Sequence, residues 1–178
     1  KGNVVGIKTD KGEFYADAVI LALGHSSTDT FFSLYNQGVK FENKPFAVGV
    51  RIEHLREDVN EWQYGKNYDK RLPTADYKLT TNVDGKGVFT FCMCPGGVVV
   101  AAASEQGRVV TNGMSSYSRS GKNANCAVAV SVLPDDFGGT VAGAIDFQRR
   151  IERAAFDIGG RGYAAPCQSV GSFLGRAG

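Results

Sequence analysis

Two cysteines separated by one residue are the side chains in this sequence best suited to chemistry. Cys92 and Cys94 flank Met93 and are followed by the turn Pro95-Gly96-Gly97. In a regular strand such a pair would point both thiols to one face, with Cα atoms about 7 Å apart. Backbone N–H groups of a glycine-rich turn can stabilise a thiolate, so redox or nucleophilic chemistry is one interpretation. Buried free cysteines in a strand are the alternative, because unpaired cysteine is among the most buried residue types.

A metal site is a third interpretation of the cysteine pair, and the spacing does not favour it. Structural zinc needs about four ligands. His25 and His54 are the only histidines of the sequence, and neither is close to the pair along the chain. We therefore expect no metal. The chain also lacks the dense disulfide framework of a small secreted protein, which favours a reducing, cytoplasmic compartment; its four cysteines are Cys92, Cys94, Cys126 and Cys167.

A long polar segment, residues 104–125, is the second candidate for a site. It carries neutral donors around Arg119, and such a set suits a carboxylate or carbonyl ligand. Polar loops beside short strands often carry binding groups. An ordinary solvated loop fits the same composition. No Ser-His-Asp or Cys-His arrangement can be recognised in the sequence.

The third candidate is the apolar run Ala16–Gly24, which has the pattern of a parallel strand buried on both faces. A glycine at the end of such a strand lets backbone N–H groups approach nucleotide phosphates or a ribityl chain. Many α/β strands end in glycine for packing reasons alone. The sequence has neither a G-x-G-x-x-G after a strand nor a G-x-x-x-x-G-K-[ST] motif, so it does not encode a complete dinucleotide site.

The elements that must position these residues can be read from hydrophobic spacing and turn signals. We expect a β-hairpin over residues 4–16, a short helix capped by Thr28 or Asp29 that ends just before Gly38, and a second helix over 55–64. An apolar stripe and a Gly-Gly end signal predict one long helix over 140–158. Short strands are expected at 46–54, 77–81, 88–93, 98–103, 109–111 and 127–133. The predicted fold class is α+β, a mostly antiparallel sheet with one long packed helix, preceded by a partial α/β unit.

Composition and charge narrow the function classes. The chain has 178 residues, of which 43% are hydrophobic and 21% charged, as in globular domains rather than disordered chains. A net charge of +2 does not favour nucleic acid or an anionic membrane as partner. No apolar run reaches the roughly 20 residues of a membrane-spanning helix. Strand-like sequence begins already at Val4 and no signal peptide is recognisable, so we expect an internal piece of a longer protein.

Several stretches resemble flavoproteins. The segment Ala16–Ser26 resembles the strand before the Ala-Thr-Gly turn of flavoproteins with two dinucleotide-binding domains, with Ala22-Leu23-Gly24 in place of that turn. The later motifs are similar to a narrower group, the uncharacterised bacterial FAD-dependent dehydrogenases of the NAD(P)/FAD-dependent oxidoreductase type. The matching stretches are Val48–His54, Gln63–Gly65, Phe91–Gly97, Ala103–Glu105, Asn112–Ser115, Asn123–Asn125, Phe147–Arg149 and Ala165–Gln168.

The resemblance implies that the chain contains parts of two domains with different functions. Residues 1–42 would be a remnant of the FAD-binding, Rossmann-like domain, and residues 43–178 the inserted substrate-side domain. FAD would be bound by the longer protein and not tightly by this piece. Its partners would be the rest of the flavoprotein chain and a small-molecule substrate of undefined identity. An exposed apolar patch on the separated piece would favour self-association.

We expect three groups of site residues in this arrangement. The cofactor would contact Gly24, His25 and Ser26. The catalytic candidates are Cys92, Cys94 and Arg119. The substrate cleft would be lined by Gly96, Gly97, Ser104, Glu105, Asn112, Met114, Ser115, Asn123 and Asn125. The alternative function is a non-catalytic binding or interaction domain whose cysteines are structural.

Overall fold

A computed structural model describes residues 2–176 and divides the chain into two compact units. The N-terminal unit ends at Val39 and the C-terminal unit begins at Lys40. No helix among residues 2–176 is both long enough and apolar enough to cross a membrane.

The N-terminal unit contains a hairpin and one helix. Strands β1 (Gly6–Thr9) and β2 (Gly12–Tyr15) pair antiparallel around a two-residue turn, as the alternating sequence predicts. Helix α1 (Thr28–Asn36) begins after Ser27, although no side chain caps its first turn. The helix ends before Gly38, whose φ of +84° suits glycine at a helix end.

The predicted buried strand Ala16–Gly24 is wrong. None of its residues pairs with a strand within the described part of the chain, and the Ile20 side chain is 90% exposed. A strand needs neighbours for its backbone N–H and C=O groups, and a parallel strand needs them on both sides. The apolar pattern indicates which surface must be buried but supplies no partner for it.

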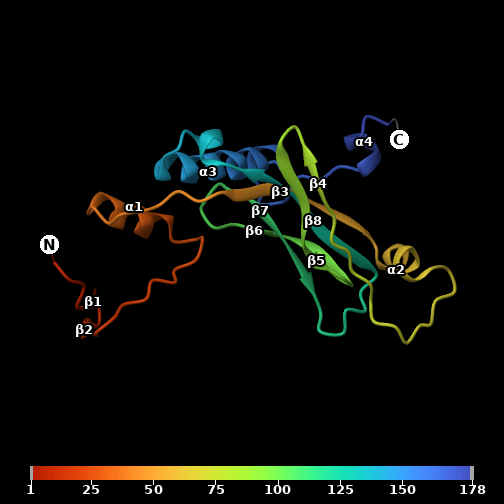
Figure 1. Cartoon of the computed structure of the whole chain (residues 1–178), viewed down its shortest axis with the longest axis horizontal. Coiled ribbons are helices and arrows are strands. Elements are labelled where there is room, and N and C mark those ends of the chain that lie inside the picture. The colour runs from red at the N-terminus through yellow and green to blue at the C-terminus, as the bar shows by residue number, and fades with distance from the viewer. Residues whose placement is uncertain (1, 177–178) are drawn as a thin grey trace. The chain divides into compact units, whose positions relative to one another are not determined.

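The C-terminal unit is built on a four-stranded antiparallel sheet in the order β3-β8-β5-β4 (Figure 1). Strands β3 (Phe46–Leu55) and β8 (Asn123–Val132) pair along their whole length. Strand β5 (Lys86–Cys94) lies on the other side of β8 and carries β4 (Thr80–Val83) at its edge. A separate hairpin joins β6 (Gly97–Ala102) to β7 (Val110–Ser115). The α+β class with mostly antiparallel sheets is confirmed.

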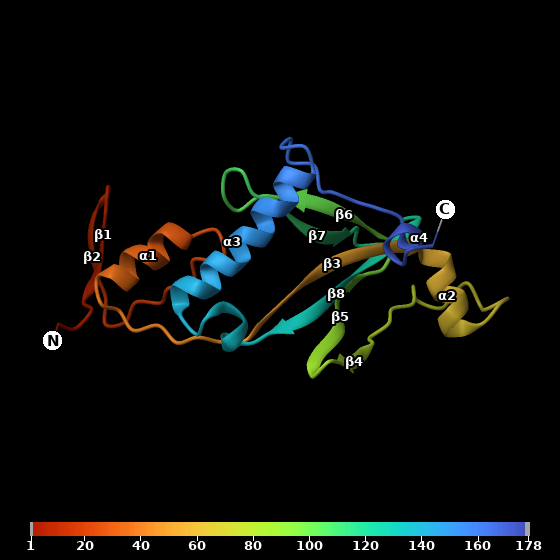
Figure 2. The same cartoon turned by 90° about the horizontal axis from the view of Figure 1, so that it is seen from above.

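Helices lie at both ends of this sheet. Helix α2 (Arg56–Tyr64) follows β3 directly, and the 3-10 turn η1 (Pro134–Phe137) follows β8. The C-terminal part of the long helix α3 (Val141–Ile158) lies against the loop between β6 and β7 (Figure 2), where the Val109 N–H donates to the Glu152 carbonyl at 3.0 Å. A short helix, α4 (Val170–Phe173), comes last.

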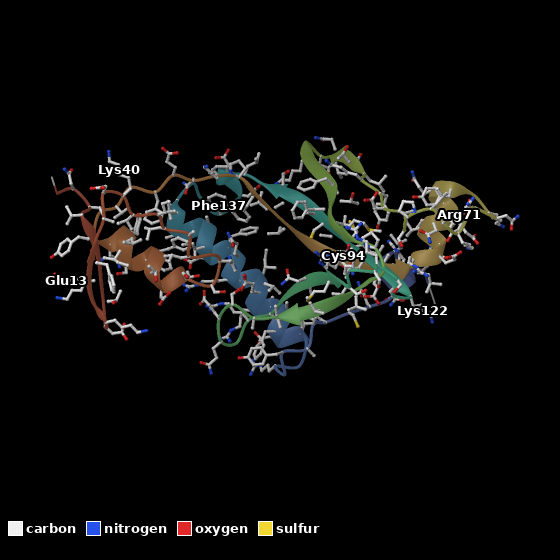
Figure 3. The ribbon with its side chains drawn as sticks, turned by 90° about the horizontal axis from the view of Figure 1, so that it is seen from below. Glu13, Lys40, Arg71, Cys94, Lys122 and Phe137 are labelled. Carbon is white, nitrogen blue, oxygen red and sulfur yellow. The ribbon has the colours of Figure 1, made fainter. Side chains whose placement is uncertain are left out.

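Two clusters of apolar side chains mark the two ends of the sheet. At the end near α2, Val59, Ala75 and Ala124 are buried together. At the other end, the Phe46 ring stacks on Phe137 with centroids 5.4 Å apart. Figure 3 shows Phe137 and Cys94 well separated along the sheet, so the cysteine pair lies at the α2 end.

The first turn of α3 offers a direct test of helix capping. The Thr140 hydroxyl accepts a hydrogen bond from the Gly143 N–H at 3.0 Å. Thr140→Ala should lower the free energy of unfolding by about 1 kcal/mol, because that N–H then lacks its acceptor. Thr140→Ser keeps the oxygen and should cost clearly less in the same urea titration. Equal losses for both variants would contradict the capping role.

Candidate functional site

A β-bulge separates the two cysteines of the pair. Along the β5–β8 ladder Phe91 faces Ala127, but the next partners are Cys94 and Asn125, so β5 carries one extra residue there. Cys92 has a φ of +50°, in the left-handed region. Its side chain is exposed, whereas Cys94 is only 8% exposed. The expectation of two equivalent thiols on one face of a regular strand is therefore wrong.

Arg51 of β3 ties the bulge to the sheet. Its Nη1 donates to Asn125 Oδ1 at 2.6 Å and to the Cys92 carbonyl at 3.2 Å, and it lies 4.0 Å from Cys94 Sγ. The Cys94 thiol also donates to the Cys92 carbonyl at 3.4 Å. We call Arg51, Cys94 and Asn125 the Arg51 cluster. It joins β3, β5 and β8, and its Asn125 is fully buried.

Gly113 of β7 lies directly over the Arg51 cluster. A Cβ atom at this position would come closer than 3.0 Å to Arg51 Nη1, Asn125 Oδ1 and Cys94 Sγ. Only glycine lets the β6–β7 hairpin approach the sheet this closely. Gly113 belongs to the Asn112–Ser115 stretch, but its sequence did not predict a place in the site, and no role was predicted for Arg51. Neither shows a local signal, because the cluster forms only when four strands come together.

Gly96 and Gly97 allow close packing within the chain itself. Gly96 is buried with a φ of +64°, and a Cβ there would overlap the Arg119 carbonyl. A Cβ on Gly97 would overlap the Met114 carbonyl. The turn after Cys94 thus packs against the segment 114–121. The structure brings Cys94, Gly96, Gly97, Met114, Ser115, Arg119 and Asn125 into one region.

Arg119 and the β7 side chains contribute the exposed part of this region. The Arg119 carbonyl accepts from Thr74 Oγ1 at 3.3 Å, and its side chain is exposed. Asn112, Met114 and Ser115 are also exposed, with Met114 at 61%. These groups are accessible to a ligand, in contrast to the buried Gly96 and Gly97.

Asn123 and Glu105 have structural partners. Asn123 Nδ2 donates to Glu53 Oε1 at 2.6 Å, across the β3–β8 pair. The Glu105 carboxylate accepts two hydrogen bonds of 3.0 Å from the Arg149 guanidinium of α3 and also contacts Arg108. Ser104 and Glu105 lie in the loop between β6 and β7, at the opposite end of that hairpin from Gly97. They are not brought together with the cysteine pair.

The proposed cofactor residues form an exposed turn in the N-terminal unit. Gly24, His25 and Ser26 are all exposed. Gly24 has a φ of +73°, and a Cβ built on it would meet no atom within 4 Å. The His25 carbonyl accepts from Thr28 Oγ1 at 3.4 Å at the start of α1. Because the backbone at Gly24 is exposed and no other atom crowds it, it suits the close approach of a ligand.

A second polar cluster lies on the face of the sheet opposite to Arg51, because neighbouring residues of a strand point to opposite faces. His54 Nε2 lies 2.8 Å from the Tyr77 hydroxyl. Burial raises the pKa of Tyr77 to about 12 and also raises the pKa of the fully buried Cys126 thiol. Both groups are therefore protonated at neutral pH, which suits a structural role. No spacing in the sequence indicated this cluster.

Thiol exposure gives a prediction for all four cysteines. Cys92 and Cys167 are exposed, whereas Cys94 and Cys126 are buried. A maleimide should label the first two rapidly in the native chain and the other two only after denaturation. Mass spectrometry of Cys92→Ser and Cys167→Ser identifies the fast sites. Labelling of Cys94 as fast as Cys92 would contradict the bulged arrangement.

Within residues 2–176, no three or more His, Cys, Asp or Glu side chains are placed to hold a metal ion.

Comparisons with known proteins agree with the flavoprotein motifs. Residues 45–177 match the family described as "FAD-dependent protein, C-terminal domain-like". An uncharacterized protein of Clostridium beijerinckii is 48% identical over 177 residues, which cover 97% of this chain and 33% of the relative. The chain thus spans about a third of the length of that relative. On the family match, the chain belongs to the FAD-dependent protein, C-terminal domain-like family.

Proposed function

We propose that this chain is the substrate-side part of an FAD-dependent oxidoreductase of the dehydrogenase type. The observation that carries the proposal is the family match over residues 45–177, in a chain that covers only a third of its relative. In this proposal residues 1–42 are a remnant of the FAD-binding domain and residues 43–178 the inserted substrate-side domain. The start of the match and the structural division after Val39 both lie near that boundary.

FAD in the longer protein would accept a hydride from the substrate, and this chain would orient the substrate beside it. The open backbone of Gly24 suits contact with the cofactor, together with His25 and Ser26. Since the sequence lacks a glycine-rich phosphate loop, most of the FAD contacts must come from elsewhere in the longer protein. We therefore propose that the chain alone binds FAD weakly.

The substrate would meet the exposed side chains near the cysteine pair. Cys92, Asn112, Met114, Ser115 and Arg119 are accessible there. Cys94 and Asn125 lie beneath them and hold the region in shape through Arg51. We propose that Cys92, Cys94 and Arg119 affect turnover, Cys94 through the placement of the bulge.

The competing function is a binding or interaction domain whose cysteines are structural. The burial of Cys94 and Cys126 favours this interpretation for those two thiols. In either case the rest of the longer protein is the proposed partner for exposed apolar side chains of the sheet, among them Val50 and Val83.

Flavin binding tests the proposal most directly. The full-length Clostridium beijerinckii relative should purify with FAD or take up one FAD on titration, whereas this chain should bind it weakly. Substitution of the relative's residues that match Cys92, Cys94 and Arg119 should alter the flavin absorbance spectrum or its reduction by substrate. A relative that takes up no flavin would overturn the proposed function. Unchanged flavin behaviour in all three variants would overturn the site assignment alone.

A further inference from the structure

Arg51 is a half-buried guanidinium held without an acidic partner. Its Nη1 alone contacts Asn125 Oδ1, the Cys92 carbonyl and Cys94 Sγ, and all three are neutral groups. No carboxylate of the described residues lies within ion-pair distance of it. Burying a charge without a counter-charge is unfavourable, so this position calls for an anion.

The acid nearest to Arg51 along its own strand face is already engaged. Glu53 lies two residues further along β3, and its carboxylate accepts from the Val99 N–H at 3.0 Å and from Asn123 Nδ2 at 2.6 Å. Arg149 shows the contrasting case, because Glu105 accepts two parallel hydrogen bonds from the Nε–Nη2 edge of its guanidinium.

The free edge of the Arg51 guanidinium remains available. Nε and Nη2 donate to no group among the described residues, and neither is enclosed away from solvent. These two nitrogens form the planar edge that binds a carboxylate through two parallel hydrogen bonds. Because the two N–H groups of Nη1 are held by Asn125 Oδ1 and the Cys92 carbonyl, the orientation of that edge is set before a ligand arrives.

An apolar surface continues from Arg51 across the sheet. Arg51 faces Ala127 on β8, and Ala127 faces Phe91 on β5, so the three side chains share one face. Phe91 is 64% exposed, which is unusual for an aromatic ring on a central strand. The next row of the same face, which contains Asn125, is covered by Gly113 of the β6–β7 hairpin.

We propose that Arg51 and Phe91 form a binding site for a small organic carboxylate with an apolar body. The carboxylate binds the Nε–Nη2 edge of Arg51, and the apolar body lies over Ala127 against the Phe91 ring. As a statement about the substrate class this inference rests on the proposed function. The binding itself involves only the C-terminal unit and needs no flavin.

Side-chain NMR of the chain tests the site with three probes at constant ionic strength. Sodium phenylacetate carries both features, sodium acetate lacks the ring, and 2-phenylethanol lacks the charge. Phenylacetate should shift the Arg51 Nε–H and Phe91 ring signals and bind most tightly of the three. If its shifts fall elsewhere, or if 2-phenylethanol binds as tightly, the proposal is wrong.

Variants separate the two contacts. Arg51→Gln should weaken phenylacetate binding about tenfold or more, whereas Arg71→Gln, at an exposed arginine paired with Asp69 in the loop after α2, should leave it within about twofold. Phe91→Ala should reduce phenylacetate binding to the level of acetate. If Arg51→Gln unfolds, Arg51→Lys keeps the charge without the planar edge and should still weaken binding. An equal loss in Arg71→Gln would overturn the assignment to Arg51. Failure of carboxylate binding leaves the flavin proposal standing, and absence of flavin in the longer relative leaves the carboxylate site standing.

Discussion

Gly96→Ala should destabilise the C-terminal unit by about 3 kcal/mol, since two separate costs meet at this residue. The left-handed φ of +64° is unfavourable for alanine. In addition, the new Cβ would overlap the Arg119 carbonyl, a backbone group that cannot rotate away. The segment 114–121 would have to move off the turn. Urea unfolding followed by circular dichroism measures the loss.

Gly85→Ala is the matched control for this prediction. Gly85 has a φ of +79° in the turn between β4 and β5, and a Cβ there would meet no atom within 4 Å. It isolates the conformational cost, which should be about 1 kcal/mol. If the two variants lose the same stability, the close packing of Gly96 against Arg119 contributes nothing.

Gly113→Ala should break the Arg51 cluster and cost about 2–4 kcal/mol. Its Cβ would fall closer than 3.0 Å to three atoms of the cluster, Cys94 Sγ at 2.5 Å among them. Arg51 would lose its fixed orientation, or β7 would move away from the sheet. Either change exposes Cys94, so its reaction with maleimide should speed up in the native state.

Gly87→Ala serves as the control for Gly113→Ala. Gly87 also lies in a strand, β5, but a Cβ there would meet only the Ser131 hydroxyl at 3.2 Å. That side chain can rotate, so the loss of stability should stay below about 1 kcal/mol. A native-like rate of Cys94 labelling in Gly113→Ala would show that Gly113 does not protect the cluster.

Local signals predicted much of the fold. The apolar stripe of α3 and the glycines after Ile158 lie within one element, and the helix runs and ends where they indicate. The hairpin β1–β2 likewise follows from alternation around a short turn. The prediction of a strand over Ala16–Gly24 was wrong because a strand also depends on neighbouring strands, which its own residues do not specify.

The candidate site was less predictable for a related reason. The cysteine pair, Asn125 and the Asn-Gly-Met-Ser motif were recognised as residue types, but their contacts depend on a one-residue bulge at Cys92. One extra residue in a strand reverses the face to which the following side chains point. The regular spacing of the two cysteines therefore predicted the wrong neighbours for Cys94. Arg51 carried no signal of its own, because its partners come from β5 and β8.

The order of strands in the sheet has a consequence for folding kinetics. Strand β8 lies between β3 and β5, yet it is made after both of them. Phe46 pairs with Val132, so β3 is not fully paired until about two thirds of the C-terminal unit has been synthesised. Closing such long loops before any pairing is gained slows folding. The pairing of β3 and β5 with β8 should therefore form late, and a nascent chain that ends before β8 should expose β3 and one edge of β5 to chaperones or aggregation.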